Sequence, residues 1–459
     1  MPKGSGLSMT ECNQTTFPFE AHFSRRVEAR FDGCQMTTDG GALLLRAVDR
    51  KIRLLQRIVA CFTDGRDPQR VEHELSEMLA QRIYGLALGY EDLNDHEELR
   101  HDPLLGVLAG KRELQQPLAG KSTLNRLEWT PAEEPHRYHK ISYSAEALDA
   151  LLVGVFLEAH ARPPHEIVLD LDVTDTPLHG EQEARFFHGY YGHYCYLPLY
   201  IFCGEHLLCA RLRPSNQDAS AGSVEEVARL VRQIRRCWPR VNIILRADSG
   251  FCREELMAWC EEHEVDYVFG LARNSRLRCN IARPLREAKQ EHQRTGKAAR
   301  VFAEFSYRTR KSWSRRRRVV AKAEYLEKGE NPRFVVTSLD AQPWPMQKLY
   351  ERLYCARGEM ENRIKEQLSL FSDRLSTETL RANQLRLYFS SLAYVLVQAL
   401  RRLALAGTEW ASAQVETIRL RLLKIAAEVR LTARRIWVRY SRAYPWKSFF
   451  AAAHAALSG

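Results

Sequence analysis

The spacing of apolar residues predicts helices in the first third of the chain. Between residues 38 and 127, apolar side chains recur three to four positions apart, as in Leu75, Met78, Leu79 and Ile83. One helical turn takes about 3.6 residues, so this spacing places such side chains on one face. We therefore expect a mainly helical region over residues 1–150. The segment 131–135, with a proline at each end, is expected to mark a boundary.

From residue 167 onward, short apolar runs alternate with helical stretches. Strands are predicted over 167–173, 241–247 and 265–271, helices over 224–237 and 253–262, and a hairpin over 194–212 with Gly204 at its turn. Such alternation is typical of an α/β fold built on a sheet. We assign residues 160–274 to the first part of this sheet region and residues 346–405 to its second part.

Residues 275–345 interrupt the alternation. They contain three β-type runs, over 301–307, 319–325 and 334–339, joined by basic connections, and this pattern predicts a β-rich insertion. Helical spacing returns at residue 347, so residues 406–459 are expected to form a helical, basic C-terminal region. Over residues 415–442, apolar and basic side chains are predicted to occupy two stripes of one helix. The basic stripe contains Arg421, Lys424, Arg435, Arg439 and Arg442.

Composition narrows the class of protein. The chain has 459 residues, enough for about three domains, and 45% are hydrophobic, which excludes wholesale disorder. A net charge of +11 fits a polyanionic partner such as nucleic acid. The 11 cysteines show no Cys-x-x-Cys spacing, which argues against a disulfide framework and a zinc ribbon. No signal peptide or membrane span is indicated, so a cytoplasmic location is expected.

Acidic residues cluster at the ends of two predicted strands. Asp170 and Asp172 are two positions apart and therefore project from the same face of a strand, and Asp175 follows just beyond it. Asp248 closes the strand at 241–247. Open α/β sheets place their ligands at the carboxyl ends of strands. The sequence therefore predicts an acidic site at this edge of the sheet.

A third acid comes from a predicted helix over residues 350–367. At the helical pitch, Tyr354, Arg357, Glu361 and Lys365 form one polar stripe. Carboxylates that converge on a sheet end make an oxygen-rich site suited to Mg²⁺ or Mn²⁺. A pair of such ions can activate a water or a 3′-hydroxyl and stabilise the leaving oxygen in displacement at phosphorus. Arg357 is expected to neutralise the phosphate or to orient Glu361.

These motifs together resemble those of the DDE transposases of bacterial insertion sequences, in the group with a Tyr-x2-Arg-x3-Glu-x6-Lys signature. Tyr354, Arg357 and Glu361 match its first three positions, whereas Leu368 stands at the fourth and Lys365 on the same helical face is the candidate substitute. Further likenesses are Asp172-Val173-Thr174, the run 246–251 (Arg-Ala-Asp-Ser-Gly-Phe), the runs 179–180 and 187–191, and the run 414–420.

This resemblance implies an RNase H-like core in which Asp172, Asp248 and Glu361 hold two Mg²⁺ (or Mn²⁺) ions. Glu361 follows Asp248 by 113 residues, a spacing that accommodates the β-rich insertion. Asp170 is the second candidate for the first acid and Asp175 the third. The resemblance further implies a nucleoid-associated enzyme, dimeric or larger when active, that cleaves at terminal inverted repeats and joins 3′-hydroxyls to target DNA. A nuclease without strand transfer and a non-catalytic DNA-binding protein are the alternatives.

Two basic segments are candidates for DNA contact. Residues 308–318 hold seven Arg or Lys and no acid, with Trp313 at the centre, a composition suited to backbone contact and base stacking. The expected DNA-binding residues are Arg310, Lys311, Trp313, Arg315, Arg316, Arg317, Arg318, Arg421, Lys424, Arg435 and Arg439. The helical region 1–150 is expected to add DNA-binding or dimerisation surface. The tyrosines at 190, 191, 194 and 196 are expected to pack within a hairpin.

Overall fold

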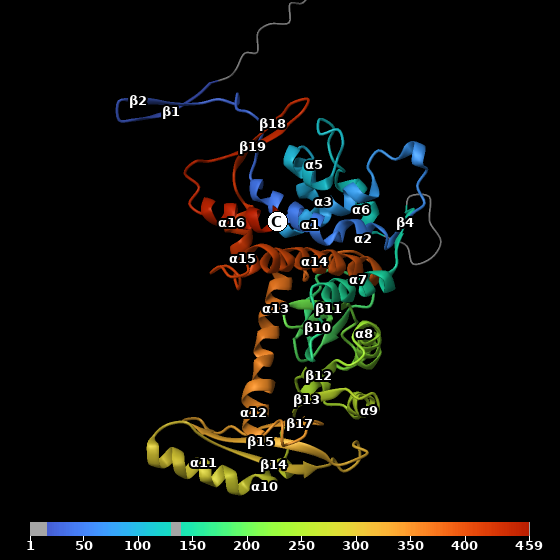
Figure 1. Cartoon of the computed structure of the whole chain (residues 1–459), viewed down its shortest axis with the longest axis vertical. Helices are drawn as coiled ribbons and strands as arrows, with labels where there is room; N and C mark the ends of the chain where they lie inside the picture. Colours follow the sequence, from blue (N-terminus) through green and yellow to red (C-terminus); the bar gives the residue numbers. More distant parts are fainter. Residues whose placement is uncertain (1–15, 130–138, 459) are drawn as a thin grey trace, which may run out of the picture.

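The computed structural model describes residues 16–129 and 139–458 (Figure 1). The expected boundary at 131–135 lies outside the described residues. The molecule is elongated, with helices from both ends of the chain at one end, a mixed sheet in the middle and the insertion at the other end. It is thus a mixed α/β structure with a large mixed sheet and many helices, as expected for the fold class.

The helical end is built from segments far apart in the sequence. The 21-residue helix α14 is buried along nearly its whole length, because helices before the sheet and helices after it pack around it. Glu128 on α6 is fully buried and accepts hydrogen bonds from Arg82 on α3 and Arg386 on α14, each 2.7 Å long. The helices of this end are α1 (Leu43–Ile52), α2 (Leu54–Val59), α3 (Leu75–Leu88), α4 (His96–Leu99), α5 (Pro103–Ala109), α6 (Lys121–Glu128), α7 (Ala145–Glu158), α14 (Leu380–Leu400) and α16 (Lys447–Ser458).

The central sheet has the strand order β11-β10-β6-β12-β13-β17-β15-β14, with β16 paired to β15. Strand β10 runs antiparallel to both β6 and β11, whereas β6, β12 and β13 are mutually parallel. The strands predicted over 167–173, 241–247 and 265–271 and the helices over 224–237 and 253–262 are confirmed within one or two residues. The predicted hairpin turns at Gly204, but its first strand begins at Leu199 rather than at residue 194. The first five strands are β6 (Glu166–Val173), β10 (Leu199–Cys203), β11 (His206–Arg211), β12 (Asn242–Ala247) and β13 (Asp266–Leu271).

Different layers cover the two faces of this sheet. Leu169 and Leu171 point into a core that α8 (Ser223–Cys237) and α9 (Glu254–Glu262) close. Val168 points the other way, toward Leu349 and Leu353. Since side chains alternate along a strand, Asp170 and Asp172 share the face of Val168. This second face is covered by the helical segment of α12 (Met346–Lys348), a π-helical stretch (Leu349–Tyr354), a 3-10 turn (Cys355–Arg357) and α13 (Gly358–Leu368).

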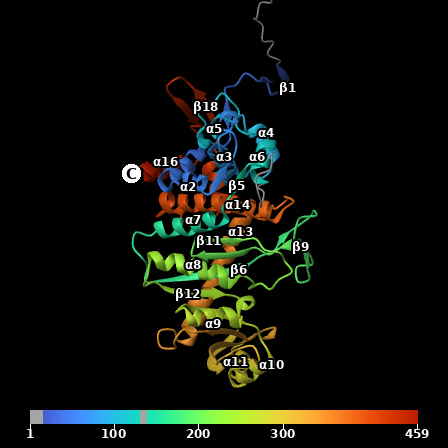
Figure 2. The same ribbon diagram turned by 90° about the vertical axis from the view of Figure 1, so that its right-hand side faces the viewer.

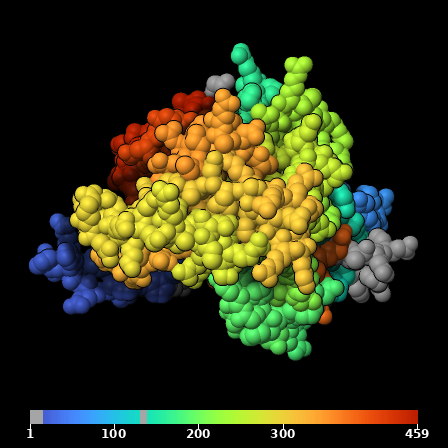
Figure 3. Space-filling model, turned by 90° about the horizontal axis from the view of Figure 1, so that it is seen from below, coloured from blue at the N-terminus to red at the C-terminus, as the bar shows by residue number. Residues whose placement is uncertain are grey.

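The insertion differs from the expectation in two ways. Its first part is helical, and its strands extend the central sheet, because β17 pairs with β13. The register that joins them opposes Phe269 and Val336, both buried. Figure 3 shows the insertion from below, where it covers this end of the molecule. Its elements are α10 (Ser275–Asn280), α11 (Ala282–Thr295), β14 (Ala299–Tyr307), β15 (Arg317–Leu326), β16 (Gly329–Glu330) and β17 (Arg333–Thr337).

The single helix expected over 415–442 is wrong. The helical part ends at Leu423, and a hairpin of β18 (Ala427–Leu431) and β19 (Ile436–Tyr440) follows. The pairs Val429–Val438 and Leu431–Ile436 oppose each other across the hairpin. Val429 and Ile436 fit the predicted helical stripe, but the paired residues also alternate with a period of two, and β-branched side chains favour strands. Short α15 (Val415–Ile418) precedes the hairpin.

Smaller elements complete the described chain. None of its helices, α14 included, combines the length and apolar character that crossing a membrane requires. The remaining strands are β1 (Phe17–His22), β2 (Arg25–Ala29), β3 (Met36–Thr37), β4 (Phe62–Asp64), β5 (Ile141–Tyr143), β7 (Thr176–Pro177), β8 (Phe186–His188) and β9 (His193–Tyr196).

Candidate active site

Asp172 and Asp248 lie side by side at the carboxyl ends of two parallel strands. In the pairing of β6 with β12, Leu171 stands opposite Ala247, so the next residue on each strand is an aspartate. Both acids follow buried, apolar strand residues that fix their position. The predicted acidic edge therefore exists for these two residues.

Arg357 connects this pair to Glu361. Its Nη1 donates a hydrogen bond to Oδ2 of Asp172 at 2.8 Å, and its Nη2 lies 3.8 Å from Oε1 of Glu361. Burial opposes the charge of Arg357, but Asp172, Tyr354, Asp248 and Glu361 more than offset it, so the pKa of Arg357 is raised. One guanidinium thus serves three carboxylates from three elements.

The pKa of the Asp172 carboxyl is raised toward neutral pH. Burial, together with the negative charge of Asp248, raises the pKa of Asp172 to about 6, against the opposing pull of Arg357. A carboxylate with a raised pKa is stabilised by any cation that approaches it. In the described structure Arg357 is the cation that contacts Asp172.

Tyr354 reaches the same edge of the sheet because residue 270 is a glycine. A Cβ atom at Gly270 would lie 2.6 Å from the Tyr354 hydroxyl and 2.9 Å from the backbone nitrogen of Ser249. Burial raises the pKa of the Tyr354 hydroxyl, and Asp248 adds to this while Arg357 opposes it. Sequence reasoning missed Gly270, whose only signal was a glycine within an apolar strand.

The other two candidates for the first acid are engaged elsewhere. Asp170 is buried and accepts two hydrogen bonds from Arg246, at 2.5 and 2.7 Å. Arg246 also donates to the carbonyl of Leu353 at 2.6 Å, and thereby ties the sheet to the covering helix. Asp175 bonds to Nε2 of His193 at 2.8 Å. Among the three, the structure brings only Asp172 beside Asp248.

Three of the four residues in the predicted polar stripe lie at the candidate site, and Lys365 does not. Tyr354, Arg357 and Glu361 gather at the site even though the helix passes through π and 3-10 turns before α13. Lys365 is exposed one turn beyond Glu361, and Leu368 is half-buried. The structure places Lys365 on the outer side of α13, away from the buried Ile364 and Glu366.

The three carboxylates are not yet arranged as a closed metal site. Within residues 16–129 and 139–458, no three His, Cys, Asp or Glu side chains are grouped closely enough to hold an ion. The side chain of Glu361 is 58% exposed and free to turn toward the two aspartates. The donor set itself, three carboxylates about one guanidinium, fits a hard divalent cation.

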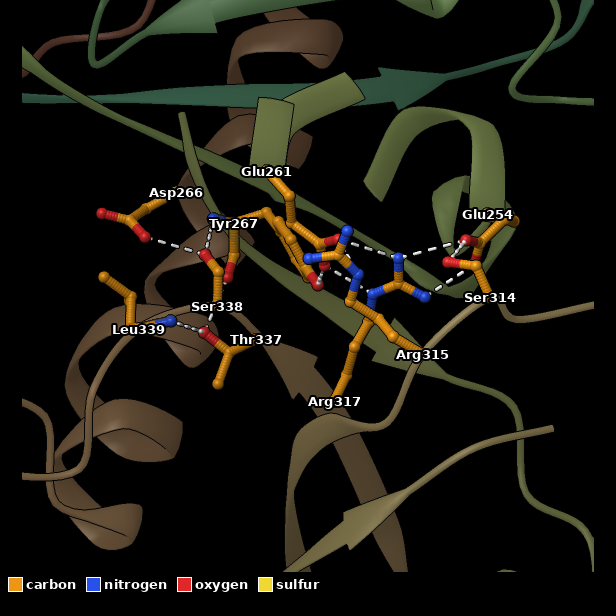
Figure 4. Close-up of polar contacts among 10 residues, drawn as sticks. All are labelled: Glu254, Glu261, Asp266, Tyr267, Ser314, Arg315, Arg317, Thr337, Ser338 and Leu339. Atoms are coloured by element: carbon orange, nitrogen blue, oxygen red, sulfur yellow. Dashed lines mark hydrogen bonds and ion pairs between the residues drawn. The ribbon is translucent and has the colours of Figure 1, made fainter. Parts of the chain in front are cut away.

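Two of the expected DNA contacts in the insertion are wrong because the side chains are buried. Trp313 is 6% exposed and Arg317 is 4% exposed. Arg317 pairs with Glu254 and Glu261 of α9, each at 2.6 Å (Figure 4). Its guanidinium also lies over the Trp313 ring. These acids lie more than 50 positions away in the sequence, so a local charge pattern could not reveal them. The insertion is therefore fastened to α9.

The remaining basic residues of the segment differ in exposure. Arg318 is half-buried and bonds to Glu304 and two backbone carbonyls. The loop presents four exposed basic side chains from the expected set, namely Arg310, Lys311, Arg315 and Arg316.

The C-terminal basic residues do not share a helical stripe. Lys424 pairs with Asp39 at 2.9 Å and lies over the Tyr90 ring, which holds it against the protein. Arg421 is exposed beside Trp446. Arg435 and Arg439 are exposed on the β18–β19 hairpin. Arg435 lies in the turn of the hairpin and Arg439 on β19, so neither is on a helix.

Comparison with known proteins identifies the family. Residues 19–459 match the family model described as Transposase DDE domain group 1. No curated protein sequence matches the chain. A solved structure titled as the cryo-EM structure of a piggyBac transposase synaptic complex with hairpin DNA is similar, with 11% identity, 84% of this chain and 80% of that chain covered, and a TM-score of 0.43. Because the family model spans nearly the whole sequence, the chain belongs to the DDE transposase family.

Proposed function

We propose that the protein is a metal-dependent DNA transposase that binds terminal inverted repeats, cleaves phosphodiester bonds there and joins 3′-hydroxyls to target DNA. The observation that carries this proposal is the convergence of Asp172, Asp248 and Glu361 about Arg357. A bacterial insertion sequence as the source, and the nucleoid as the location, belong to the same proposal.

We further propose that β11-β10-β6-β12-β13 form an RNase H-like core. An antiparallel meander of three strands followed by two parallel strands supports this. Asp172 ends its first strand and Asp248 follows its fourth in chain order. The division into 1–150, 160–274, 275–345, 346–405 and 406–459 is proposed with it, although helices from the first and last segments share one core.

The mechanism assigns separate tasks to the site residues. Asp172, Asp248 and Glu361 would hold two Mg²⁺ or Mn²⁺ ions, which when bound activate the attacking oxygen and stabilise the leaving oxygen. Arg357 balances the carboxylates in the free protein and is placed to contact the phosphate of the DNA strand. The close approach of the Tyr354 hydroxyl to Gly270 sets the distance between the covering helix and the sheet, and this distance sets the position of Glu361.

The proposed DNA surface lies in two places. The insertion loop offers Arg310, Lys311, Arg315 and Arg316, whose exposed charges suit backbone phosphates. Arg421, Arg435 and Arg439 lie at the opposite end of the molecule (Figure 1). A two-stranded ribbon such as β18–β19 has the width that the major groove admits. Since two DNA ends must be joined, at least a dimer is proposed for the active complex.

The deciding experiment is cleavage and joining of a labelled duplex that carries the element's own end, with Mg²⁺ and with EDTA. We expect metal-dependent nicking and joined product, both lost in Glu361→Ala. Glu359→Ala, an exposed change on the same helix, is the matched control and should retain activity. Nicking without joining would indicate a nuclease, and binding without cleavage under any metal would leave a DNA-binding protein.

A further inference from the structure

A hairpin rich in aromatic residues leaves the sheet directly after the candidate acids. Residues 185–196, here called the aromatic hairpin, contain β8 and β9, and β9 pairs with β7 just beyond Asp175. Figure 2 shows β9 projecting from the side of the molecule at the level of β6. The hairpin thus belongs to a small separate sheet in the segment that connects β6, the strand of Asp172, to β10.

Its aromatic side chains face solvent. Tyr190 is 87% exposed, Phe187 58% and Tyr194 45%, whereas Tyr196 at the base is fully buried. The expectation that these tyrosines pack within a hairpin is therefore confirmed for Tyr196, holds in part for Tyr194, which packs against Phe187, and is wrong for Tyr190. Clustered exposed aromatic surface is costly in water and marks a site of interaction.

The exposed rings form two edge-to-face pairs. Phe187 and Tyr194 meet edge to face at 5.6 Å on one face of the hairpin, and the guanidinium of Arg185 lies over Tyr194 at 4.9 Å. At the tip, Tyr190 and Tyr191 meet edge to face at 5.0 Å. In an edge-to-face pair one ring leaves its flat side uncovered, and that side can accept another planar group.

The opposite face of the hairpin is tied to the candidate active site. His193 bonds to Asp175, three residues after Asp172. Burial together with the charges of Asp175, Tyr190 and Asp172 raises the pKa of Tyr191 to about 12. The contact between His193 and Asp175 therefore joins the hairpin to the segment that directly follows Asp172.

The base of the hairpin is held firmly while its tip has room. Ser215 donates to the carbonyl of Phe186 at 2.9 Å, and the Tyr196 hydroxyl donates to the carbonyl of Glu183 at 2.5 Å. The turn contains Gly189 and Gly192, the latter with φ of +76°. No Asp or Glu occurs between residues 184 and 196, so an anionic strand can approach without repulsion.

We propose that the aromatic hairpin binds unpaired DNA bases next to the phosphodiester held at Asp172 and Asp248, by stacking them on Phe187, Tyr190 and Tyr194. The inference rests on the proposed function and adds the substrate feature that the site would favour. Stacking needs only the flat face of a base and is therefore tolerant of sequence. Adjacency to the acid pair and the lack of acids on the hairpin favour DNA over a protein partner.

The test compares two fluorescent DNA probes of arbitrary sequence, a fully paired duplex and the same duplex ending in an unpaired fork. Binding of the full-length protein to each is followed by anisotropy at one salt concentration, without divalent metal. We expect the wild type to prefer the fork by about tenfold, the size that one or two stacked bases supply. The double variant Phe187→Ala/Tyr190→Ala should bind both probes equally.

Two controls isolate stacking from folding. Phe23→Ala removes an aromatic ring that is 91% exposed on the distant β1–β2 hairpin, and it should keep the fork preference. Tyr190→Trp keeps a flat ring and should keep the preference as well. An adenine analogue whose fluorescence falls on stacking can be placed in the fork. The wild type and the two control variants should quench it, and the double variant should not.

Each other outcome has a defined meaning. An unchanged fork preference in the double variant, equal loss on both probes, or a changed oligomeric state with an unchanged preference would overturn the inference. Duplex binding by the wild type without fork preference would overturn it too, while leaving the proposed function standing. Absence of binding to either DNA at low salt would contradict the proposed function itself.

Discussion

Two aspartates on one face of β6 have opposite surroundings. Asp170 is buried under the covering helix and pairs with Arg246. Asp172 is two residues nearer the end of the strand, and it pairs with Arg357 beside Asp248. Both pairs connect the sheet to the same helical segment. Both members of the first pair are buried, whereas the second pair has an exposed glutamate next to it. The comparison separates a structural ion pair from a site poised for chemistry, although the residue types are the same.

The largest expected effect comes from Asp172→Asn. Mutation of a residue that only orients a metal ligand typically lowers activity about 10–100-fold. Loss of a proposed ligand itself should therefore lower the cleavage rate by more than about 100-fold. Stability should be kept or slightly raised at neutral pH, because the charged form of Asp172 is disfavoured by burial. Cleavage rates and urea unfolding measure the two effects. A variant that is strongly destabilised but cleaves at the wild-type rate would show that Asp172 has a structural role rather than a catalytic one.

Asp170→Ala should show the opposite profile. It leaves Arg246 buried without its carboxylate, and breaking a buried ion pair costs about 3–5 kcal/mol in the free energy of unfolding. Asp175→Asn, which alters a more exposed pair with His193, is the matched control and should cost far less. Equal stability of the Asp170→Ala variant and the wild type in urea would show that this pair does not hold the helix.

Gly270→Ala tests whether Tyr354 sets the position of the helix. The added methyl would meet the Tyr354 hydroxyl at 2.6 Å, and overpacking of this kind costs about 1–3 kcal/mol. Adding Tyr354→Phe removes the atom that clashes and should recover part of the loss. Unfolding of the single and double variants gives the coupling, and simple additivity would contradict the proposed contact.

The raised pKa of Asp172 predicts a pH dependence. Its folded pKa of about 6 lies above the ordinary value of 3.8, so its contribution to stability is present below pH 3.8 and is lost as pH rises through 6. Affinity for Mn²⁺ should rise over the same interval, because only the carboxylate binds metal. Urea unfolding between pH 4 and 7 should show this loss in the wild type and a flatter curve in Asp172→Asn.

The smallest expected effect is that of Lys365→Ala. The side chain is exposed on α13, so stability should change by less than about 0.5 kcal/mol. If Lys365 replaces the signature lysine, one phosphate contact is lost, and the slope of log affinity against log salt should fall by about 1. An unchanged slope would show that Lys365 does not contact DNA.

Much of the central sheet could be predicted because each strand has its own apolar run. The pairing of Asp172 with Asp248 followed from their positions at strand ends, and Arg357 and Glu361 from helical spacing. The hairpin at β18–β19 was missed because Val429 and Ile436 fit a helical stripe as well as a pair of strands. The burial of Arg317 was missed because its partners Glu254 and Glu261 come from a distant helix. Long-range pairing, rather than local pattern, decided both cases.

The enclosure of α14 by helices from both ends of the chain has a consequence during synthesis. Residues 43–158 cannot complete their core until Leu380–Leu400 and the segment beyond it have been made. At roughly 5–20 residues per second, the ribosome needs on the order of ten to fifty seconds to add the intervening chain. During that interval the early helices expose apolar surface to chaperones and proteases. Chains that end prematurely lack α14, and they should be degraded rather than accumulate as partial, DNA-binding fragments.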